Sequence, residues 1–281
     1  MIDLHTHTQV SDGTDTPFDL VNKALSTGLT TLAITDHDSI DGWDAAKRAL
    51  RANLKLVLGA EISTITQDGI SVHMLGLLFD GSDKAMISML NETRDQRVPR
   101  MKRIIELLQQ DGIAISMEEV LNAAPDGATV GRPHLADALV AKGFIKNRDE
   151  AFQGLLNNDS KYYVENVAPT PEEAIRVIKN AGGVSVIAHP YASRRGQIIT
   201  AETFSNLVAA GLNGIEVEHR DQNEQERADL RGVARELNLV MTGSSDYHGT
   251  GKLNSLGENL TNPAEWERLE SLAAERRVVS K

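Results

Sequence analysis

Histidines and acidic residues recur in this chain in short motifs whose spacing suits metal binding. His5 and His7 stand two residues apart, so both side chains leave the same face of an extended backbone. Two imidazoles on one face supply half of a metal site, and Asp12 in the polar loop that follows can add a carboxylate. Taken alone, the pair is equally typical of surface histidines beside a turn, so the positions of the other histidines decide between the two interpretations.

The remaining histidines are distributed in a way that favours the metal interpretation. Strands are expected over residues 2–4, 30–35, 54–60, 70–79, 183–188, 214–218 and 239–242. At or beside these strands stand the candidate site residues His5, His7, Asp12, His37, Glu61, His73, His189, His219, Asp246 and His248. Of the eight histidines, only His134 lies elsewhere. So many imidazoles and carboxylates around one cavity would be electrostatically untenable without cations, so the pattern predicts a site for divalent metal ions.

The elements that must position these residues alternate in type along the chain. Strand, polar loop and helix follow one another over the first 61 residues and again from residue 171, which predicts parallel strands joined by crossover helices. The loop around residues 67–69 is too short for a crossover, so strands 54–60 and 70–79 are expected to form an antiparallel hairpin that brings His73 towards Glu61. A long helix is expected over residues 83–110, with a break at Pro99, and another over residues 263–277.

Strands nearly vanish from the middle of the chain, where short helical segments are expected instead. We therefore predict an α/β protein in two parts. The first part is a barrel domain made of residues 1–95 and 168–281, and the second is a helical insertion, or cap domain, over residues 96–167.

Composition narrows the class of protein. The 281 residues are 41 % hydrophobic and 25 % charged, as in soluble globular proteins, and no apolar run approaches the length of a membrane span. The N-terminus lacks the pattern of a signal peptide. The absence of cysteine excludes disulfides and thiolate metal sites and fits a cytoplasmic protein. The formal net charge of −11 disfavours long nucleic acids as partners.

Six motifs in chain order resemble those of the PHP (polymerase and histidinol phosphatase) superfamily of metallophosphoesterases. They are His5-Thr6-His7 with Asp12, Thr35-Asp36-His37-Asp38, Gly59-Ala60-Glu61, His73, Ala188-His189-Pro190 and Ser245-Asp246-Tyr247-His248. The resemblance implies a distorted (β/α)7 barrel, which agrees with the seven expected strands. Gly131-Arg132-Pro133-His134 is similar to a motif of the bacterial nucleotide phosphoesterases. Members of that subgroup dephosphorylate nucleoside 3′,5′-bisphosphates, degrade short RNA from the 5′ end or act on nucleoside monophosphates.

The resemblance also implies two to three divalent metal ions and their ligands. His5, His7, Glu61 and Asp246 would hold the first ion, Asp12, His37 and His248 the second, and Glu61, His73 and His189 the third, with Glu61 as a bridge. Since no ligand is a thiolate, Mn²⁺, Fe²⁺, Zn²⁺ and Mg²⁺ all fit this set. Asp36 and Asp38 face away from His37 on an extended backbone, and we expect them to orient the ligands or cap the loop.

The expected activity is that of a metal-dependent phosphoric ester hydrolase. Water activated by the metal would hydrolyse a phosphomonoester of a small nucleotide, either a nucleoside 3′,5′-bisphosphate or a nucleoside monophosphate. Three alternatives remain open: a 5′→3′ exonuclease on short oligonucleotides, a histidinol-phosphate phosphatase, and a non-catalytic metal-binding regulatory domain. The oligomeric state stays open as well.

Substrate contacts are expected from a few residues outside the metal set. Arg132 and His134 are candidates for a second phosphate contact, because Pro133 suits the first turn of a helix whose N-terminus favours an anion. His219 is a candidate phosphate ligand or proton donor to the leaving group. Lys161, Tyr162, Arg194 and Arg195 are further candidates for the wall of the cleft, although the adjacent pair Arg194-Arg195 is more typical of a solvated loop.

Overall fold

A computed structural model describes residues 1–275 and 277–281. Its elements, in chain order, are β1 (Ile2–Asp3), α1 (Pro17–Ser26), β2 (Thr31–Ile34), α2 (Trp43–Ala49), β3 (Lys55–Ile65), β4 (Ser71–Leu77), α3 (Lys84–Gln110), α4 (Met117–Ala123), α5 (Arg132–Ala141), α6 (Arg148–Gln153), α7 (Pro171–Asn180), β5 (Val184–Ala188), η1 (Ser193–Arg195), α8 (Ala201–Ala210), β6 (Gly214–Glu218), α9 (Glu224–Glu236), β7 (Val240–Gly243), η2 (Gly249–Gly251) and α10 (Pro263–Leu272).

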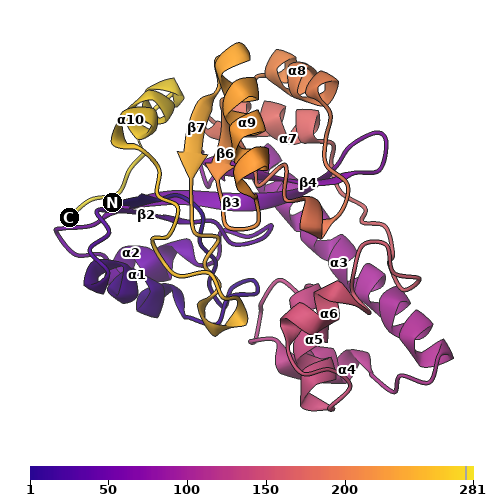
Figure 1. The fold of residues 1–281 in the computed structure, drawn as a ribbon. Helices are drawn as coiled ribbons and strands as arrows, with labels where there is room; N and C mark the ends of the chain where they lie inside the picture. Colours follow the sequence, from indigo (N-terminus) through magenta and orange to yellow (C-terminus); the bar gives the residue numbers. More distant parts are fainter. Residues whose placement is uncertain (276) are drawn as a thin grey trace.

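The strands form one seven-stranded sheet in sequence order, β1 to β7 (Figure 1). The pairs β1–β2, β2–β3, β5–β6 and β6–β7 are parallel, whereas β4 runs antiparallel to both β3 and β5. A parallel bridge between Thr6 and Tyr247 links the segments that follow β1 and β7, so the sheet is a nearly closed barrel. The predicted barrel of seven strands and its antiparallel hairpin are therefore confirmed, and the hairpin register pairs His73 with Ser63.

Helices α1, α2, α7, α8 and α9 each contribute apolar side chains to the core that they share with the strands. Thr16 caps α1 by accepting a hydrogen bond from the Asp19 N–H, and Pro17 occupies the first turn, where a missing N–H costs nothing. The main apolar core lies between these helices and the outside of the barrel. A second cluster contains residues of the strands together with Trp266 and Leu269 of α10. The core thus holds the strands in place, and polar side chains beyond the strand ends remain available for a site.

The middle of the chain is helical, as the scarcity of strand patterns predicts. Figure 1 shows α4, α5 and α6 gathered beside the end of α3, away from the sheet, and a separate apolar cluster of α3–α6 residues stabilises them. The predicted boundary at residues 95/96 lies inside α3. Two hydrogen bonds join this insertion to the loop after β1: the Thr129 N–H to the Val10 carbonyl at 2.8 Å and Arg148 Nη1 to the Asp12 carbonyl at 3.0 Å. The insertion is therefore held next to the loop that carries Asp12.

Two helix predictions differ from the structure. The break expected at Pro99 does not occur, since α3 continues through it; a proline removes one hydrogen bond and can bend a helix without ending it. The C-terminal helix expected over residues 263–277 ends at Leu272, and residue 276 lies outside the described residues. None of the helices in the described part of the chain combines the length and the apolar character of a membrane span.

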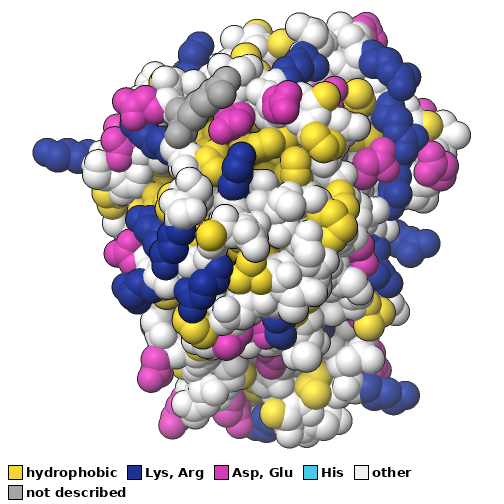
Figure 2. Space-filling view, turned by 90° about the vertical axis from the view of Figure 1, so that its left-hand side faces the viewer, with side chains coloured by type: hydrophobic (Ala, Val, Ile, Leu, Met, Phe, Trp, Pro, Cys, Tyr) yellow, Lys and Arg dark blue, Asp and Glu magenta, His cyan; other side chains and the backbone are white. Residues whose placement is uncertain are grey.

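The face that carries the chain termini shows scattered hydrophobic patches between Lys, Arg, Asp and Glu side chains, and no histidine is visible there (Figure 2). This agrees with the low exposure of most histidines: His5, His134, His219 and His248 are at most 1 % exposed. The imidazoles are therefore gathered inside the molecule, where an unpaired polar atom is costly.

Candidate metal centre

The carboxyl ends of the parallel strands and the β3–β4 hairpin bring the nine candidate metal ligands into one cluster of side chains. His5, His7 and Asp12 follow β1, His37 follows β2, and His189 follows β5. Glu61 and His73 lie on β3 and β4, while Asp246 and His248 follow β7. The predicted convergence rests on the rule that carboxyl ends of barrel strands share one mouth.

The first ligand set implied by the resemblance is compact. Nε2 of His5 and Nε2 of His7 are 3.0 Å apart. Glu61 Oε2 lies 3.3 Å from the first nitrogen and 3.1 Å from the second. Asp246 Oδ1 lies 3.5 Å from both. Four potential ligand atoms from three strands thus surround one point, an arrangement that suits a cation.

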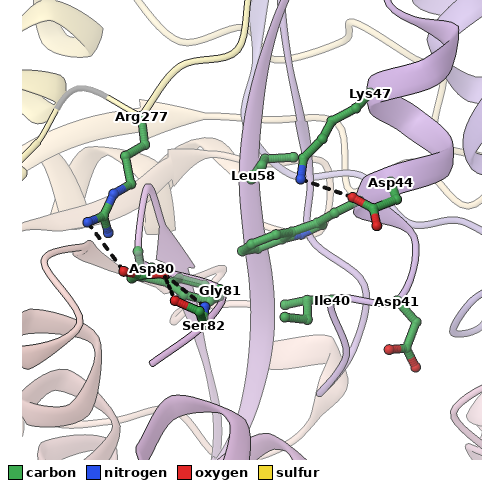
Figure 3. Close-up of a pocket in the computed structure, with 11 residues that line it drawn as sticks. Ile40, Asp41, Asp44, Lys47, Leu58, Asp80, Gly81, Ser82 and Arg277 are labelled. Atoms are coloured by element: carbon green, nitrogen blue, oxygen red, sulfur yellow. Dashed lines mark hydrogen bonds and ion pairs between the residues drawn. The ribbon is translucent and has the colours of Figure 1, made fainter. Parts of the chain in front are cut away.

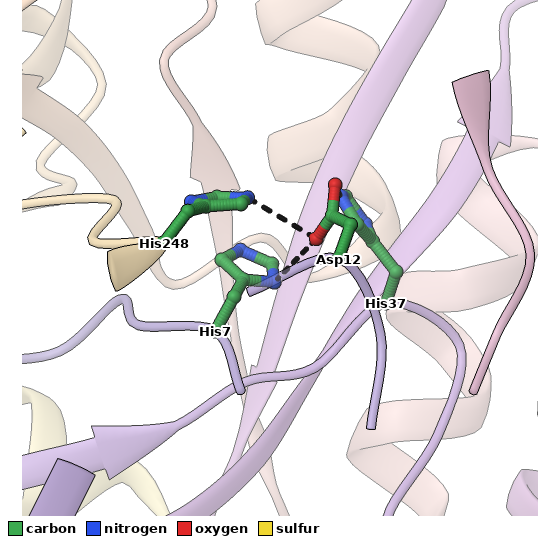
Figure 4. A group of neighbouring side chains, drawn as sticks. All are labelled: His7, Asp12, His37 and His248. Carbon is green, nitrogen blue, oxygen red and sulfur yellow. Dashed lines mark ion pairs between the residues drawn. The ribbon is translucent and has the colours of Figure 1, made fainter. Parts of the chain in front are cut away.

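The second set surrounds Asp12, as Figure 4 shows. His248 Nε2 lies 3.2 Å from Asp12 Oδ1, and His37 Nε2 lies 3.8 Å from Asp12 Oδ2. His7 Nδ1 approaches the same carboxylate at 3.7 Å. The potential ligand atoms of these four residues all lie within 4.8 Å of one another, so a single ion could reach them.

Glu61 joins the first set to the third. Its Oε1 lies 2.8 Å from His73 Nδ1 and 3.2 Å from His189 Nε2, while its Oε2 faces the histidines of the first set and His37 Nδ1 at 3.1 Å. One carboxylate with its two oxygens directed at different imidazoles has the geometry of a bridging ligand.

The protonation states of these groups also suit a metal. Burial lowers the pKa of His37 and His189 well below the ordinary value and that of His248 to about 4, so these imidazoles keep a free lone pair. Burial alone would raise the pKa of Glu61, but its interactions with the surrounding imidazoles, first among them His37 and His73, hold it well below its ordinary value. Nε2 of His248 and Nδ1 of His37 have no hydrogen-bond partner among the described residues. Buried, ionised carboxylates and unsatisfied imidazole nitrogens fit Mn²⁺, Fe²⁺, Zn²⁺ or Mg²⁺.

The aspartates that flank His37 support the surrounding loops. Asp36 accepts hydrogen bonds from the Thr8 N–H at 2.8 Å, the Thr8 hydroxyl at 2.8 Å and the Ser11 hydroxyl at 2.7 Å. Asp38 accepts one from the Ser63 N–H at 2.8 Å and pairs with Arg97. Their contacts are to the loop backbone, hydroxyls and an arginine, which is the orienting role expected from the sequence.

Of the six non-glycine residues with a positive φ among the described residues, three lie at the same place. Asp38, His189 and Asp246 have φ angles of +49°, +32° and +51°, a region that non-glycine residues rarely adopt. Such strain persists only where surrounding contacts hold it, and it is frequent at functional sites.

The predicted substrate residues do not all lie together. His219 is fully buried beside the centre, with Nε2 3.3 Å from Asp246 Oδ2. His134 is buried in the first turn of α5, where its Nδ1 accepts the Gly131 N–H at 3.1 Å. Lys161 is 69 % exposed and pairs with Asp111 at the end of α3, and Arg194 is exposed to solvent.

Arg132 is half-buried and has no carboxylate partner among the described residues. Its Nη1 donates to the Leu156 carbonyl at 2.9 Å and to Asn158 Oδ1 at 2.7 Å. Burial, reinforced by the nearby charge of Arg100, lowers its pKa to about 10, which still leaves it charged at neutral pH.

Sequence reasoning gave too little weight to Arg195. Its Nη2 donates to Asp246 Oδ2 at 2.8 Å, and its Nη1 lies 3.0 Å from His189 Nε2. Lys252 Nζ contacts the same Asp246 oxygen at 2.8 Å. The short η1 helix turns Arg195 inwards, and no local pattern distinguishes it from Arg194. Glu216 is easier to recognise from the sequence as a candidate site residue, because a charged residue in the middle of an apolar strand requires a buried partner.

A surface pocket of about 550 Å³ lies apart from these ligands and contains no histidine (Figure 3). Its charged residues all have partners: Lys47 pairs with Asp44 at 3.1 Å, Arg277 approaches Asp80 at 3.6 Å, and Asp41 pairs with Arg94 at 3.0 Å. Apolar side chains such as Leu58 complete the lining. It therefore offers no chemistry comparable to that of the buried cluster.

Comparison with known proteins agrees with the geometry. A family model described as the PHP domain matches residues 3–158. A 5′-3′ exoribonuclease of Haemophilus influenzae is 32 % identical over 92 % of this chain and 93 % of its own. A 3′,5′-nucleoside bisphosphate phosphatase of Chromobacterium violaceum is 30 % identical over 89 % of this chain and 88 % of its own.

A solved structure extends the likeness to the whole fold. The crystal structure of a putative metal-dependent phosphoesterase from Bifidobacterium adolescentis is 40 % identical and superposes with a TM-score of 0.90, covering 98 % of this chain and 96 % of that one. The barrel, the buried cluster of histidines and carboxylates, and these likenesses lead to one conclusion: the chain belongs to the PHP family and is a metal-dependent phosphoesterase.

Proposed function

We propose that this enzyme removes a phosphate from a small nucleotide that carries a second phosphate, of the nucleoside 3′,5′-bisphosphate type. The observation that carries the proposal is a cluster of three arginines, Arg97, Arg100 and Arg132. Arg100 and Arg132 lie 5.6 and 5.8 Å from the centre of the Tyr163 ring, and Arg97 pairs with Asp38 beside the metal centre. The bisphosphate phosphatase among the relatives supports the same substrate class. The absence of cysteine fits work in the reducing cytoplasm.

The reacting phosphate would lie over the nine residues of the metal centre. They are His5, His7, Asp12, His37, Glu61, His73, His189, Asp246 and His248, and two to three divalent ions is the number we propose for them. When bound, such ions supply an activated water and neutralise the charge of a phosphoryl group. The chain would then need no nucleophile of its own.

The arginine cluster would bind the second phosphate. Arg97 pairs with Asp38, the residue after His37, at 2.5 Å, which ties the cluster to the metal centre. Arg100 donates from Nε to the Val164 carbonyl at 2.8 Å, so it and Arg132 have neutral oxygens as partners. Burial and the neighbouring guanidinium Arg97 lower the pKa of Arg100 as well. Three partly buried guanidinium groups share a single carboxylate partner, Asp38, among the described residues. This excess of positive charge favours a bound anion, and arginine matches phosphate geometry.

His219 is suited to donate a proton to the leaving oxygen. Its Nδ1 accepts the Asp221 N–H at 3.0 Å, so in the neutral imidazole the proton must be on Nε2. That atom faces Asp246 Oδ2, at the edge of the cluster. A donor there can neutralise the developing alkoxide. Arg195 and Lys252, at the same edge, are suited to contact phosphoryl oxygens.

A 5′→3′ exonuclease acting on short oligonucleotides is the second candidate. The exoribonuclease among the relatives favours it, and an internucleotide phosphate could occupy the arginine cluster in place of a terminal one. The net charge of −11 disfavours long polymers. The histidinol-phosphate alternative offers no second phosphate to the arginine cluster. A regulatory domain without activity leaves the complete ligand set unexplained.

A substrate panel tests the proposal. Wild-type protein loaded with Mn²⁺ should hydrolyse a nucleoside 3′,5′-bisphosphate with a higher kcat/KM than a monophosphate or a short oligoribonucleotide.

Arg132→Ala should lower kcat/KM for the bisphosphate by roughly 10- to 100-fold, since a hydrogen bond to a charged group contributes about 1.5–3 kcal/mol. The same variant should leave the hydrolysis of p-nitrophenyl phosphate unchanged. Arg103→Ala is the matched control, because Arg103 is an exposed arginine of α3 paired with Glu106. Equal activity of both variants on the bisphosphate would contradict the second-phosphate site.

The affinity for Mn²⁺ should rise with pH. Burial would lower the pKa of His5, but the charges of Glu61, Glu216 and Asp246 outweigh it and raise this pKa well above the ordinary value. His5 therefore holds a proton in the ion-free protein at neutral pH, and a metal must displace it, so binding weakens as pH falls below that pKa. Calorimetry in two buffers of different ionisation enthalpy should show release of about one proton per ion bound at the His5 set. Heats that do not depend on the buffer would exclude this linkage.

A further inference from the structure

Glu216 is a buried carboxylate beside the metal centre that belongs to none of the ligand sets proposed above. It lies in the middle of β6 and is fully buried. Its Oε1 is 3.1 Å from His5 Nδ1, and its Oε2 accepts a hydrogen bond from the His189 N–H at 2.9 Å. One side chain therefore contacts two candidate ligands that come from different strands.

These contacts account for both oxygens of a carboxylate that has no Lys or Arg partner among the described residues. Burying a carboxylate is costly unless its oxygens are paired. Among the described residues, the Glu216 carboxylate thus acts on His5 and His189. At His189 it holds a backbone whose φ of +32° is unfavourable for a side chain with a Cβ.

At His5 the contact decides which nitrogen carries the proton. A carboxylate can only accept, so the His5 nitrogen next to Glu216, Nδ1, must carry a hydrogen. When an ion displaces the second proton of His5, the lone pair is therefore on Nε2, which lies 3.0–3.5 Å from ligand atoms of His7, Glu61 and Asp246. Histidines that bind metals usually donate their second N–H to a carboxylate or carbonyl in this way.

We propose that Glu216 is a positioning residue of the metal centre, which fixes the tautomer and orientation of His5 and the backbone of His189 for ion binding. This role rests on the proposed metal ligands. Glu216, His5 and His189 are close enough to bind an ion as a group of their own. Their present contacts, however, direct both Glu216 oxygens to N–H donors.

Glu216→Gln tests the role, because an amide cannot accept both N–H donors. Its one oxygen can serve either His5 or His189, while its NH₂ group meets a donor or forces the other His5 tautomer. We expect the tightest Mn²⁺ site, measured by calorimetry on metal-stripped protein, to weaken by roughly 10- to 100-fold, the usual cost of losing such a partner.

Glu218→Gln is the matched control on the same strand. A β-bulge between Glu216 and Glu218 turns the second side chain outwards, where it pairs with Arg231 at 2.6 Å. This variant should bind Mn²⁺ as the wild type does. Thermal unfolding of all three proteins in EDTA separates a loss of fold from a loss of metal affinity.

A second measurement needs no variant at Glu216. Two-bond ¹H–¹⁵N spectra of the Zn²⁺-loaded wild type report the histidine tautomers, with His5 assigned from a His5→Gln protein. The proposal requires a proton on His5 Nδ1 and none on Nε2. A proton on Nε2, or Mn²⁺ binding by Glu216→Gln as tight as by the wild type, would overturn the role of Glu216. Failure of the wild type itself to take up Mn²⁺ would instead refute the metal site on which the role depends.

Discussion

Replacing Glu61 with Gln should lower kcat by at least about 10³-fold, the upper end of what removal of one preorganised electrostatic group costs. Glu61 has the central position among the candidate ligands. Its two oxygens lie within 3.3 Å of nitrogens from five histidines: His5, His7, His37, His73 and His189. The amide keeps the shape of the side chain but loses the negative charge and one acceptor, so it cannot bridge cations.

The measurement is kcat at saturating Mn²⁺, together with metal content after dialysis. We expect Glu61→Gln to retain fewer ions than the wild type. Glu218→Gln, which removes a carboxylate charge outside the cluster, should keep both its activity and its metal. A Glu61→Gln enzyme with kcat within tenfold of the wild type would show that Glu61 is not the bridge between the ligand sets.

Removing the ions should also destabilise the protein. The ion-free cavity buries carboxylates and imidazoles against one another, and ions that bind only the folded chain stabilise it by mass action. At Mn²⁺ concentrations about 1,000-fold above Kd, the gain is about 4 kcal/mol, which corresponds to a rise in Tm of roughly 10 °C for a chain of this size. Activity should disappear in EDTA and return with Mn²⁺.

Thermal unfolding with EDTA and with excess Mn²⁺ gives the comparison. His7 lies in two of the clusters, next to Glu61 and next to Asp12, so His7→Ala should show a much smaller rise in Tm with Mn²⁺. Identical Tm values for the wild type with and without Mn²⁺, or full activity of His7→Ala, would argue against a metal centre in this cavity.

Prediction from sequence succeeded where the pattern is local. Alternating strands and helices identified the barrel, and the short loop near Asp68 identified the antiparallel hairpin. Histidines spaced two apart, and placed at strand ends, predicted which side chains could meet. These inferences hold because side-chain direction in a strand has a period of two and because parallel strands end on the same side of a sheet.

Prediction was weaker where a position depends on how distant segments dock. Arg97 and Arg100 lie on one long helix that carries no phosphate motif, and only the packing of the insertion brings them next to Arg132. Arg194 and Arg195 are neighbours in sequence, yet a single helical turn directs only the second to Asp246. The prediction of a break at Pro99 was wrong for a related reason, since tertiary contacts can stabilise a helix through a proline.

The sequence by itself determined the family, the barrel and the candidate ligands of a metal site, because short-range spacing and strand order specify them. The tertiary structure alone decided that Glu61 contacts five histidines, that Glu216 supports His5 and His189, and that three arginines gather beside the centre. These relations join residues far apart in the chain, and their energies depend on burial and on distances of about 3 Å, which no local pattern encodes.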